Sequence, residues 1–149
     1  MKITLLSDDA IRIESMPGPM TIEAMSETQN YSAFHMLASG LAYCTQSVLA
    51  SWATHAGIDV DDLSVEVRWS FVDEPHRVGS MDVQFTWPSL PEKRMDAAKR
   101  VVKLCAIHAT LQHQPAISIQ GRGRGLTLVG SSVTDAATDK SSPPRVAGA

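Results

Sequence analysis

A long apolar segment in the first half of the chain constrains the fold more than any other feature of the sequence. Phe34, Leu37, Leu41, Cys44 and Val48 recur at steps of three and four, the spacing of one face of an α-helix. The other faces of this segment carry further large apolar side chains and many alanines. A helix that is apolar on most faces is buried on most faces. Because a chain of 149 residues offers limited cover, we expect a second subunit to supply part of it.

The ends of this helix are indicated by capping signals. Ser26, Thr28 and Asn30 are candidate N-caps, and the run from Ser26 to Gln29 has the pattern of a capping box. Gly57 follows the last helical turn and is expected to end the helix, since glycine adopts the left-handed conformation of many helix ends.

Alternating apolar and polar residues predict strands on both sides of the helix. Short alternating segments at 3–5, 11–13 and 20–22 predict a small antiparallel meander before it. Residues 63–71 and 81–87 alternate more strictly, and we expect them to form an antiparallel hairpin through a loop at 73–80.

A second helix is predicted from a capping box that starts at Ser89. Its apolar stripe leads to Cys105, where we expect a break before a short helical turn that ends at Leu111. Further strands are predicted at 116–120 and 126–129. Hairpins with helices segregated from them define an α+β fold.

The domain organisation follows from composition. We predict one domain over residues 1–129 and a disordered C-terminal tail over residues 130–149, which are rich in small and polar residues.

Composition also limits the partners. A net charge of −3 gives no reason to expect nucleic acid, and Arg122 and Arg124 between glycines are interpreted as a solvated linker. No apolar run is long enough for a membrane span, and the first residues do not resemble a secretory signal. We therefore expect a cytoplasmic protein without a membrane partner. In a reducing cytoplasm, a transient redox pair is a better interpretation of two cysteines than a permanent disulfide.

Cys44 and Cys105 are the only cysteines, and each lies on an apolar helical stripe. One interpretation is that both are small core residues, because free cysteine is among the most buried residue types. The other is a redox pair. A metal site is not expected, since Cys44, Cys105 and His108 supply only three ligands where structural zinc takes four. No cofactor is expected either.

Two segments carry a resemblance to a known family. Residues 37–45, LASGLAYCT, and residues 103–111, KLCAIHATL, are similar to the two cysteine segments of the OsmC/Ohr family of osmotically induced and organic-hydroperoxide-resistance proteins. The resemblance covers roughly residues 26–119. It implies an OsmC-like α+β fold with antiparallel sheets, a long buried central helix and an intertwined homodimer.

The resemblance also implies an activity. Family enzymes are thiol-dependent peroxidases that reduce organic hydroperoxides. Cys44 would attack the peroxide and become a sulfenic acid, Cys105 would resolve it to a disulfide, and an external dithiol would restore both thiols.

The residues that activate the attacking sulfur in the family match less well. The classical peroxidases carry a glutamate ten residues before the first cysteine, where this chain has Phe34. Glu27 is the nearest upstream acid, and Arg12 is the only arginine before Cys44, so these two are the candidates for the activating pair. His108 is a candidate to assist the second sulfur.

A second hypothesis is a catalytically inactive OsmC-like dimer that binds a small apolar ligand. The missing glutamate favours it. For either function, we expect an apolar pocket formed by Phe34, Met36, Tyr43 and Trp52.

Overall fold

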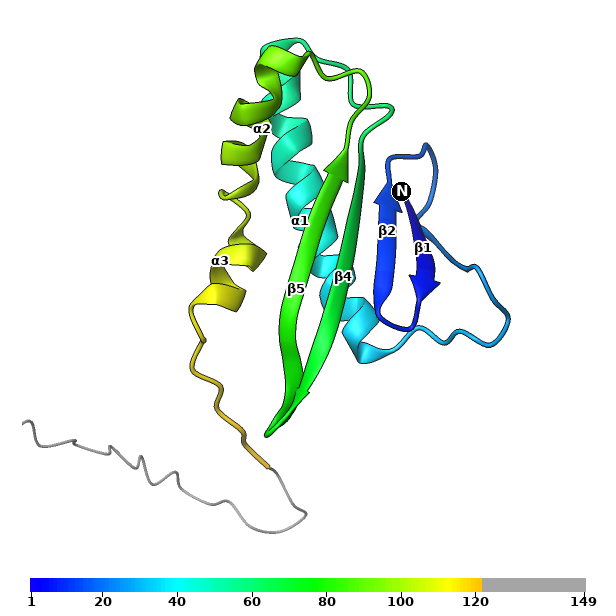
Figure 1. Cartoon of the computed structure of the whole chain (residues 1–149), viewed down its shortest axis with the longest axis vertical. Helices are drawn as coiled ribbons and strands as arrows, with labels where there is room; N and C mark the ends of the chain where they lie inside the picture. Colours follow the sequence, from blue (N-terminus) through cyan, green and yellow to red (C-terminus); the bar gives the residue numbers. More distant parts are fainter. Residues whose placement is uncertain (122–149) are drawn as a thin grey trace, which may run out of the picture. The chain divides into compact units, whose positions relative to one another are not determined.

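The computed structural model describes residues 1–121, and it confirms the α+β class (Figure 1). The elements in chain order are β1 (Lys2–Ser7), β2 (Ala10–Glu14), β3 (Thr21–Ala24), α1 (Ala33–Ala56), β4 (Ser64–Asp73), β5 (His76–Thr86), the 3-10 turn η1 (Glu92–Arg94), α2 (Met95–Val102) and α3 (Ala106–Gln112). All of these elements belong to one compact unit, Met1–Ala116.

The strands form a single five-stranded sheet in the order β3-β1-β2-β4-β5. Neighbouring strands are antiparallel except β3, which pairs in parallel with β1. The predicted meander is therefore wrong for its third strand. Glu14 at the end of β2 and Thr21 at the start of β3 both pair with Lys2. After β2 the chain therefore crosses over the start of β1, and β3 pairs with the edge of β1 that β2 does not occupy.

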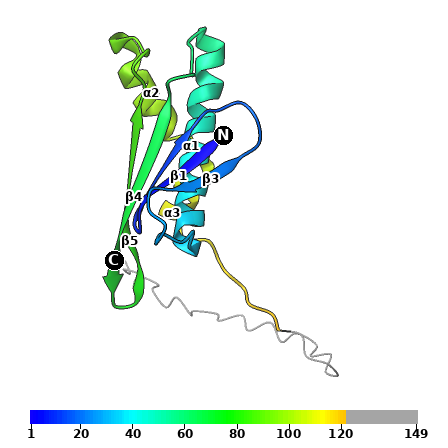
Figure 2. The ribbon, with the colours of Figure 1, turned by 90° about the vertical axis from the view of Figure 1, so that its right-hand side faces the viewer.

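The predicted hairpin after the helix is confirmed as β4 and β5, although it is longer than the sequence pattern indicates. The two strands pair from Ser64 opposite Thr86 to Asp73 opposite His76, which leaves only residues 74–75 in the loop. Val65 and Val67 of β4 are buried in the same core cluster as Leu41 of α1. Figure 2 shows α1 running along the sheet.

Helix α1 begins later than the capping signals predict. Its N-cap is Ser32, whose hydroxyl accepts the backbone N–H of His35, while the His35 imidazole accepts the backbone N–H of Ser32 at 3.2 Å. The segment starting at Ser26 instead forms a turn, in which the Gln29 side chain accepts the Ser26 N–H at 3.3 Å. Histidine is not a usual partner in a capping box, so the pattern search missed it. The predicted end at Gly57 is confirmed, with φ 65°.

His35 ties the start of α1 to the sheet. The side chain is buried, and its Nε2 lies 3.1 Å from the carbonyl oxygen of Ser7 at the end of β1. Its ring meets the Trp69 ring of β4 edge-on, with centroids 5.1 Å apart. Accepting at Nδ1 from Ser32 and donating at Nε2 to Ser7 requires the neutral imidazole.

The core follows the length of α1. One cluster surrounds the first half of the helix and includes Leu41, Val65, Val67, Trp69 and Cys105. A second cluster surrounds the other half and consists of Leu49, Ala53, Leu63, Trp87, Leu90 and Ala98. Helices α2 and α3 pack along α1 (Figure 1).

The region after the hairpin departs from the sequence prediction at two places. The Ser89 capping box does not form, because the Ser89 N–H and hydroxyl both donate to the Asp62 carboxylate, at 2.6 and 2.7 Å. The predicted strand at 116–120 is wrong, since these residues form no regular element and pair with none of the five strands. The expected break at Cys105 is present.

Some predictions fall beyond the described residues. The strand at 126–129, the tail at 130–149 and the domain boundary between residues 129 and 130 all lie there. Within residues 1–121, no helix is long and apolar enough to cross a membrane.

The role of His35 leads to a stability prediction. We expect His35→Ala to lower the free energy of unfolding by about 2–4 kcal/mol, because it removes the part-buried hydrogen bonds of the imidazole to Ser32 and Ser7 and the contact with Trp69. Urea unfolding followed by circular dichroism at one protein concentration measures this as a lower midpoint. His55→Ala, an exposed change near the other end of α1, is the control and should stay within about 0.5 kcal/mol of wild type. Equal midpoints for the two variants would contradict the role of His35.

Candidate functional site

The fold brings the two cysteines together. Cys44 lies on α1 and is half-buried, and Cys105 lies at the start of α3 and is fully buried. Both are free thiols, Cys44 packs against the core cluster that contains Cys105, and Cys44 is close enough to raise the pKa of the Cys105 thiol. The two predicted site residues therefore meet in one chain.

The position of Cys105 depends on the break between α2 and α3. Cys105 is the N-cap of α3, and its Sγ accepts the backbone N–H of His108 at 3.4 Å. A sulfur atom thus occupies the place that serine, threonine or aspartate takes in most N-caps. This geometry holds the thiol inward, against α1.

The surroundings of Cys105 favour its neutral form. Burial raises the pKa of the Cys105 thiol, and the hydrogen bond with Cys44 raises it further. The His108 N–H and the Thr45 hydroxyl lower the same pKa, but by less. Because the net direction is upward, Cys105 is mostly a thiol at neutral pH and becomes more reactive as the pH rises.

The two candidate activating residues lie elsewhere in the chain. The Arg12 guanidinium pairs with Glu66 at 3.1 Å. Its neighbours Ile11 and Ile13 point into the core, so Arg12 lies on the sheet face opposite α1. Glu27 is exposed in the turn before α1. Within one chain, the structure brings neither residue to Cys44.

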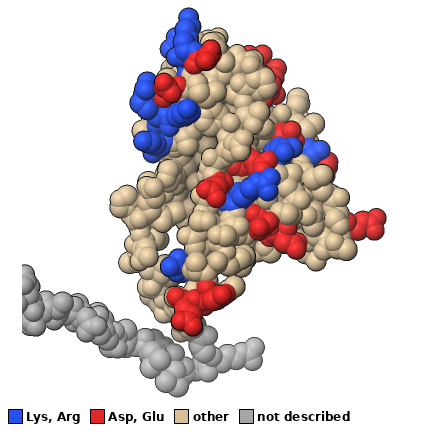
Figure 3. Space-filling model, viewed as in Figure 1, with Lys and Arg blue, Asp and Glu red and all other residues tan. Residues whose placement is uncertain are grey.

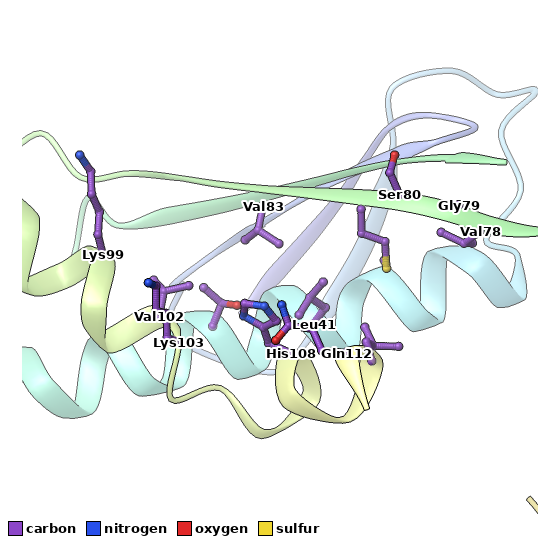
Figure 4. A pocket seen from close by; sticks show the side chains of 13 residues that line it. Leu41, Val78, Gly79, Ser80, Val83, Lys99, Val102, Lys103, His108 and Gln112 are labelled. Carbon is purple, nitrogen blue, oxygen red and sulfur yellow. The ribbon is translucent and has the colours of Figure 1, made fainter. Parts of the chain in front are cut away.

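A cavity of about 600 Å³ lies between α1, β5 and the helices that follow the hairpin (Figure 4), and its lining includes Thr45, the residue after Cys44. Leu41 and Thr45 of α1 form part of its wall, and His108 lines it from α3. The remaining lining residues are Val78, Gly79, Ser80, Met81, Val83, Lys99, Val102, Lys103, Leu111 and Gln112. His108, predicted to assist the second sulfur, therefore contacts Cys105 through its backbone and the cavity through its ring.

The pocket predicted from the sequence differs from this cavity. None of its four expected residues is among the lining residues. Phe34 stacks edge-on against Phe71, and Trp52 against Trp87. Met36 and Tyr43 lie on an exposed face of α1. Helical spacing alone does not show which face of α1 lies toward α3, and that face decides the lining.

Sequence reasoning missed the basic side chains at the cavity. Lys99 of α2 and Lys103, the C-cap residue of that helix, both line it. They belong to a group of Lys and Arg side chains that gathers over η1 and α2, seen at the upper left of Figure 3. The spacing of four residues between these two lysines was the signal in the sequence that could have placed them on one side of a helix. Among residues 1–121, no cluster of three His, Cys, Asp or Glu side chains is placed to hold a metal ion.

An α+β unit with two free thiols on neighbouring helices, α1 and α3, defines the class of protein. The sequence matches the model of the OsmC-like protein family over residues 26–120. The chain therefore belongs to the OsmC-like family, and the resemblance seen in its two cysteine segments is confirmed.

Comparison of structures supports the same fold. The chain is similar to a protein of Psychrobacter arcticus 273-4 described as a candidate osmotic stress induced and detoxification response protein. The TM-score is 0.51 at 18% identity, covering 72% of this chain and 84% of the other. No curated protein sequence matches the chain.

The proximity of the two thiols predicts a specific product of mild oxidation. We expect diamide to form an intramolecular Cys44–Cys105 disulfide, because the two thiols lie close together in one chain and only one hydrogen is lost from each. Formation should accelerate from neutral to alkaline pH, since the raised pKa of Cys105 keeps it protonated at neutral pH. Intact-protein mass spectrometry with peptide mapping measures both results. Cys44→Ser and Cys105→Ser serve as controls that cannot form the bridge, and a predominantly intermolecular disulfide in wild type would contradict the geometry.

Proposed function

We propose that this chain is a thiol-dependent peroxidase that reduces organic hydroperoxides and acts as a homodimer. The proximity of Cys44 to Cys105, next to a cavity lined by Thr45 and His108, is the observation that carries the proposal. Membership of the OsmC-like family supports it, as does the name of the Psychrobacter protein, which refers to detoxification.

In the first step, the Cys44 thiolate attacks one oxygen of the peroxide. The O–O bond breaks, an alcohol leaves after taking a proton, and Cys44 becomes a sulfenic acid. Cys44 is the more accessible sulfur, which suits it to the attack, whereas Cys105 is fully buried and suits resolution.

In the second step, Cys105 attacks the sulfenic sulfur. An S–S bond forms, the S–O bond breaks, and hydroxide leaves as water after protonation. An external dithiol then reduces the disulfide in two exchange steps and is itself oxidised to a disulfide. A reducing cytoplasm, where such dithiols are maintained, is the compartment we propose.

The cavity supports an organic substrate. Leu41, Met81, Val83, Val102 and Leu111 give it an apolar lining that fits a hydrocarbon group better than hydrogen peroxide. Lys99 and Lys103 add positive charge to the same cavity.

We propose that a second copy of the chain covers the exposed apolar face of α1 and forms a homodimer. Met36 and Tyr43 of α1 are 59% and 54% exposed, and Gly40 lies between them on an exposed face. Exposed apolar patches of this kind mark interfaces. Arg12 and Glu27 lie away from Cys44 in one chain, so they act at the sulfur pair only if a second copy brings them there.

The alternative function is a non-catalytic OsmC-like dimer that binds a small apolar ligand. The specific observation in its favour is that Arg12 is paired with Glu66 and Phe34 occupies the place of the family glutamate. The cavity would then be the binding site, and the cysteine pair would have a structural role.

Peroxide turnover separates these two functions. We expect wild type to consume an alkyl hydroperoxide in the presence of dithiothreitol and Cys44→Ser to lose at least about 100-fold in kcat/KM, since the attacking sulfur is removed. Cys105→Ser should still form the Cys44 sulfenic acid, which dimedone traps and mass spectrometry detects. Hydrogen peroxide is the control substrate and should react more slowly. Wild-type turnover no faster than that of Cys44→Ser would refute the enzyme and favour the ligand-binding alternative.

The proposed dimer is tested by mass in solution. We expect light scattering after size-exclusion chromatography to give twice the chain mass at micromolar concentration. Tyr43→Arg should weaken this dimer, because it places a charge in an apolar interface. Asp8→Arg, which changes an exposed charge in the turn between β1 and β2, should leave the mass unchanged. A monomeric wild type would rule out the dimer.

A further inference from the structure

Thr45, the residue after Cys44, has a buried hydroxyl that the proposed mechanism does not use. The side chain is 1% exposed, and its Oγ1 has no hydrogen-bond partner within the described part of the chain. A buried hydroxyl left without a partner destabilises the folded state, because its lost hydrogen bonds to water are not replaced. Such a cost calls for an explanation in the chemistry of the site.

Two other helical threonines show what Thr45 does not do. Thr54 donates to the carbonyl oxygen of Ala50 at 3.0 Å, and Thr110 donates to that of Ala106 at 2.9 Å. This bond to the carbonyl four residues earlier is the usual way in which a helix satisfies a threonine hydroxyl. Thr45 leaves that bond unmade, so its hydroxyl is available to another acceptor.

The acceptor within reach is the sulfur of Cys105. Thr45 and His108 line the same cavity, and the His108 N–H donates to the Cys105 Sγ. The Thr45 hydroxyl is also close enough to lower the pKa of the Cys105 thiol. A neutral thiol is a weak acceptor and leaves the hydroxyl unpartnered, whereas a thiolate accepts a strong, charge-assisted hydrogen bond.

We propose that Thr45 is a further residue of the redox site, whose hydroxyl donates to Cys105 whenever that sulfur carries negative charge. This inference rests on the proposed peroxidase function for its biological role, but the contact itself does not require a peroxide. It assigns to α1 a second function besides carrying Cys44.

The charge on Cys105 arises twice in the reaction. Before resolution, Cys105 loses its proton, and its thiolate attacks the Cys44 sulfenic sulfur, displacing hydroxide. During recycling, a thiolate of the external dithiol attacks the Cys44 sulfur, the S–S bond breaks, and Cys105 leaves as the thiolate with the bonding electron pair. Thr45 donates to the attacking thiolate in one step and to the leaving thiolate in the other.

Among the groups around the site, Thr45 is the side chain placed to donate a hydrogen bond to the Cys105 thiolate. Cys44, the His108 ring, Lys99 and Lys103 are the titratable groups at the pair and its cavity. Only two groups lower the pKa of Cys105, the backbone N–H of His108 and the nearby hydroxyl of Thr45. A substitution can remove the Thr45 hydroxyl, whereas the backbone N–H of His108 stays in place when its side chain is changed.

The test compares Thr45→Val, which keeps the side-chain shape without the hydroxyl, with Thr45→Ser, which keeps the hydroxyl. The first measurement is the thiol–disulfide equilibrium of the full chain against reduced and oxidised dithiothreitol from pH 6 to about pH 10. The second is the lifetime of the Cys44 sulfenic acid, trapped with dimedone after one equivalent of cumene hydroperoxide. Thr54→Val is the matched control on the same helix.

We expect Thr45→Val to lower the equilibrium constant for reduction by about threefold to tenfold at alkaline pH and to leave it unchanged at pH 6, where Cys105 is protonated in every variant. The sulfenic acid should persist about threefold to tenfold longer, because a smaller thiolate fraction outweighs the higher nucleophilicity of a more basic thiolate. Thr45→Ser should restore both values, and Thr54→Val should match wild type.

A Thr45→Val protein that folds and shows the wild-type equilibrium at every pH would overturn the proposal. A change that is the same at all pH values, or that Thr45→Ser fails to restore, would also overturn it, since it would indicate a packing effect. If Thr45→Val does not fold, Thr45→Ala replaces it under the same criteria. Because the equilibrium is measured without peroxide, absence of peroxidase activity would count against the proposed function and not against Thr45.

Discussion

The packing of α1 against the sheet is the interaction on which the rest of the structure depends. The helix lies on β2 and β4, and its other buried side receives α2 and α3. Its buried residues therefore fix both the sheet and the two later helices. His35 anchors its first turn to β1 and β4, and Gly57 ends the helix before the β4–β5 hairpin. Every residue of the candidate site is positioned relative to this one helix.

The cysteine pair combines two opposing physical requirements. Burial protects a reactive sulfur from solvent, but it also raises the energy of the thiolate that does the chemistry. In this chain the compensation falls on Cys105, through the His108 N–H and the Thr45 hydroxyl. Within residues 1–121, Arg12 is held by Glu66 and does not supply a positive charge at Cys44. In the proposed homodimer, the second copy of the chain would supply the group that stabilises the Cys44 thiolate.

Sequence patterns identified the helices and strands, but not which strands pair or which groups bind the capping serines. Alternation found β1, β2, β4 and β5, since each has one buried and one exposed face. The direction of β3 was not accessible, because every residue of that strand is exposed and its pairing depends on where the chain steps past Lys2. The capping boxes at Ser26 and Ser89 were wrong for a similar reason. Ser26 is used in a local turn, and Ser89 is bound by Asp62, which lies far away in sequence.

The sequence by itself determined the class of fold, the family, the two cysteines and the break at Cys105, because these follow from local spacing and from two short motifs. Tertiary structure decided which residues surround the sulfurs. Arg12 and Glu27 had suitable chemistry but lie on other surfaces, whereas Thr45 had no distinguishing motif and lies beside Cys105. The physical reason is that a helical residue faces a given neighbour only through the rotation and packing of whole elements. That packing is a sum over many long-range contacts, which no single segment of the sequence contains.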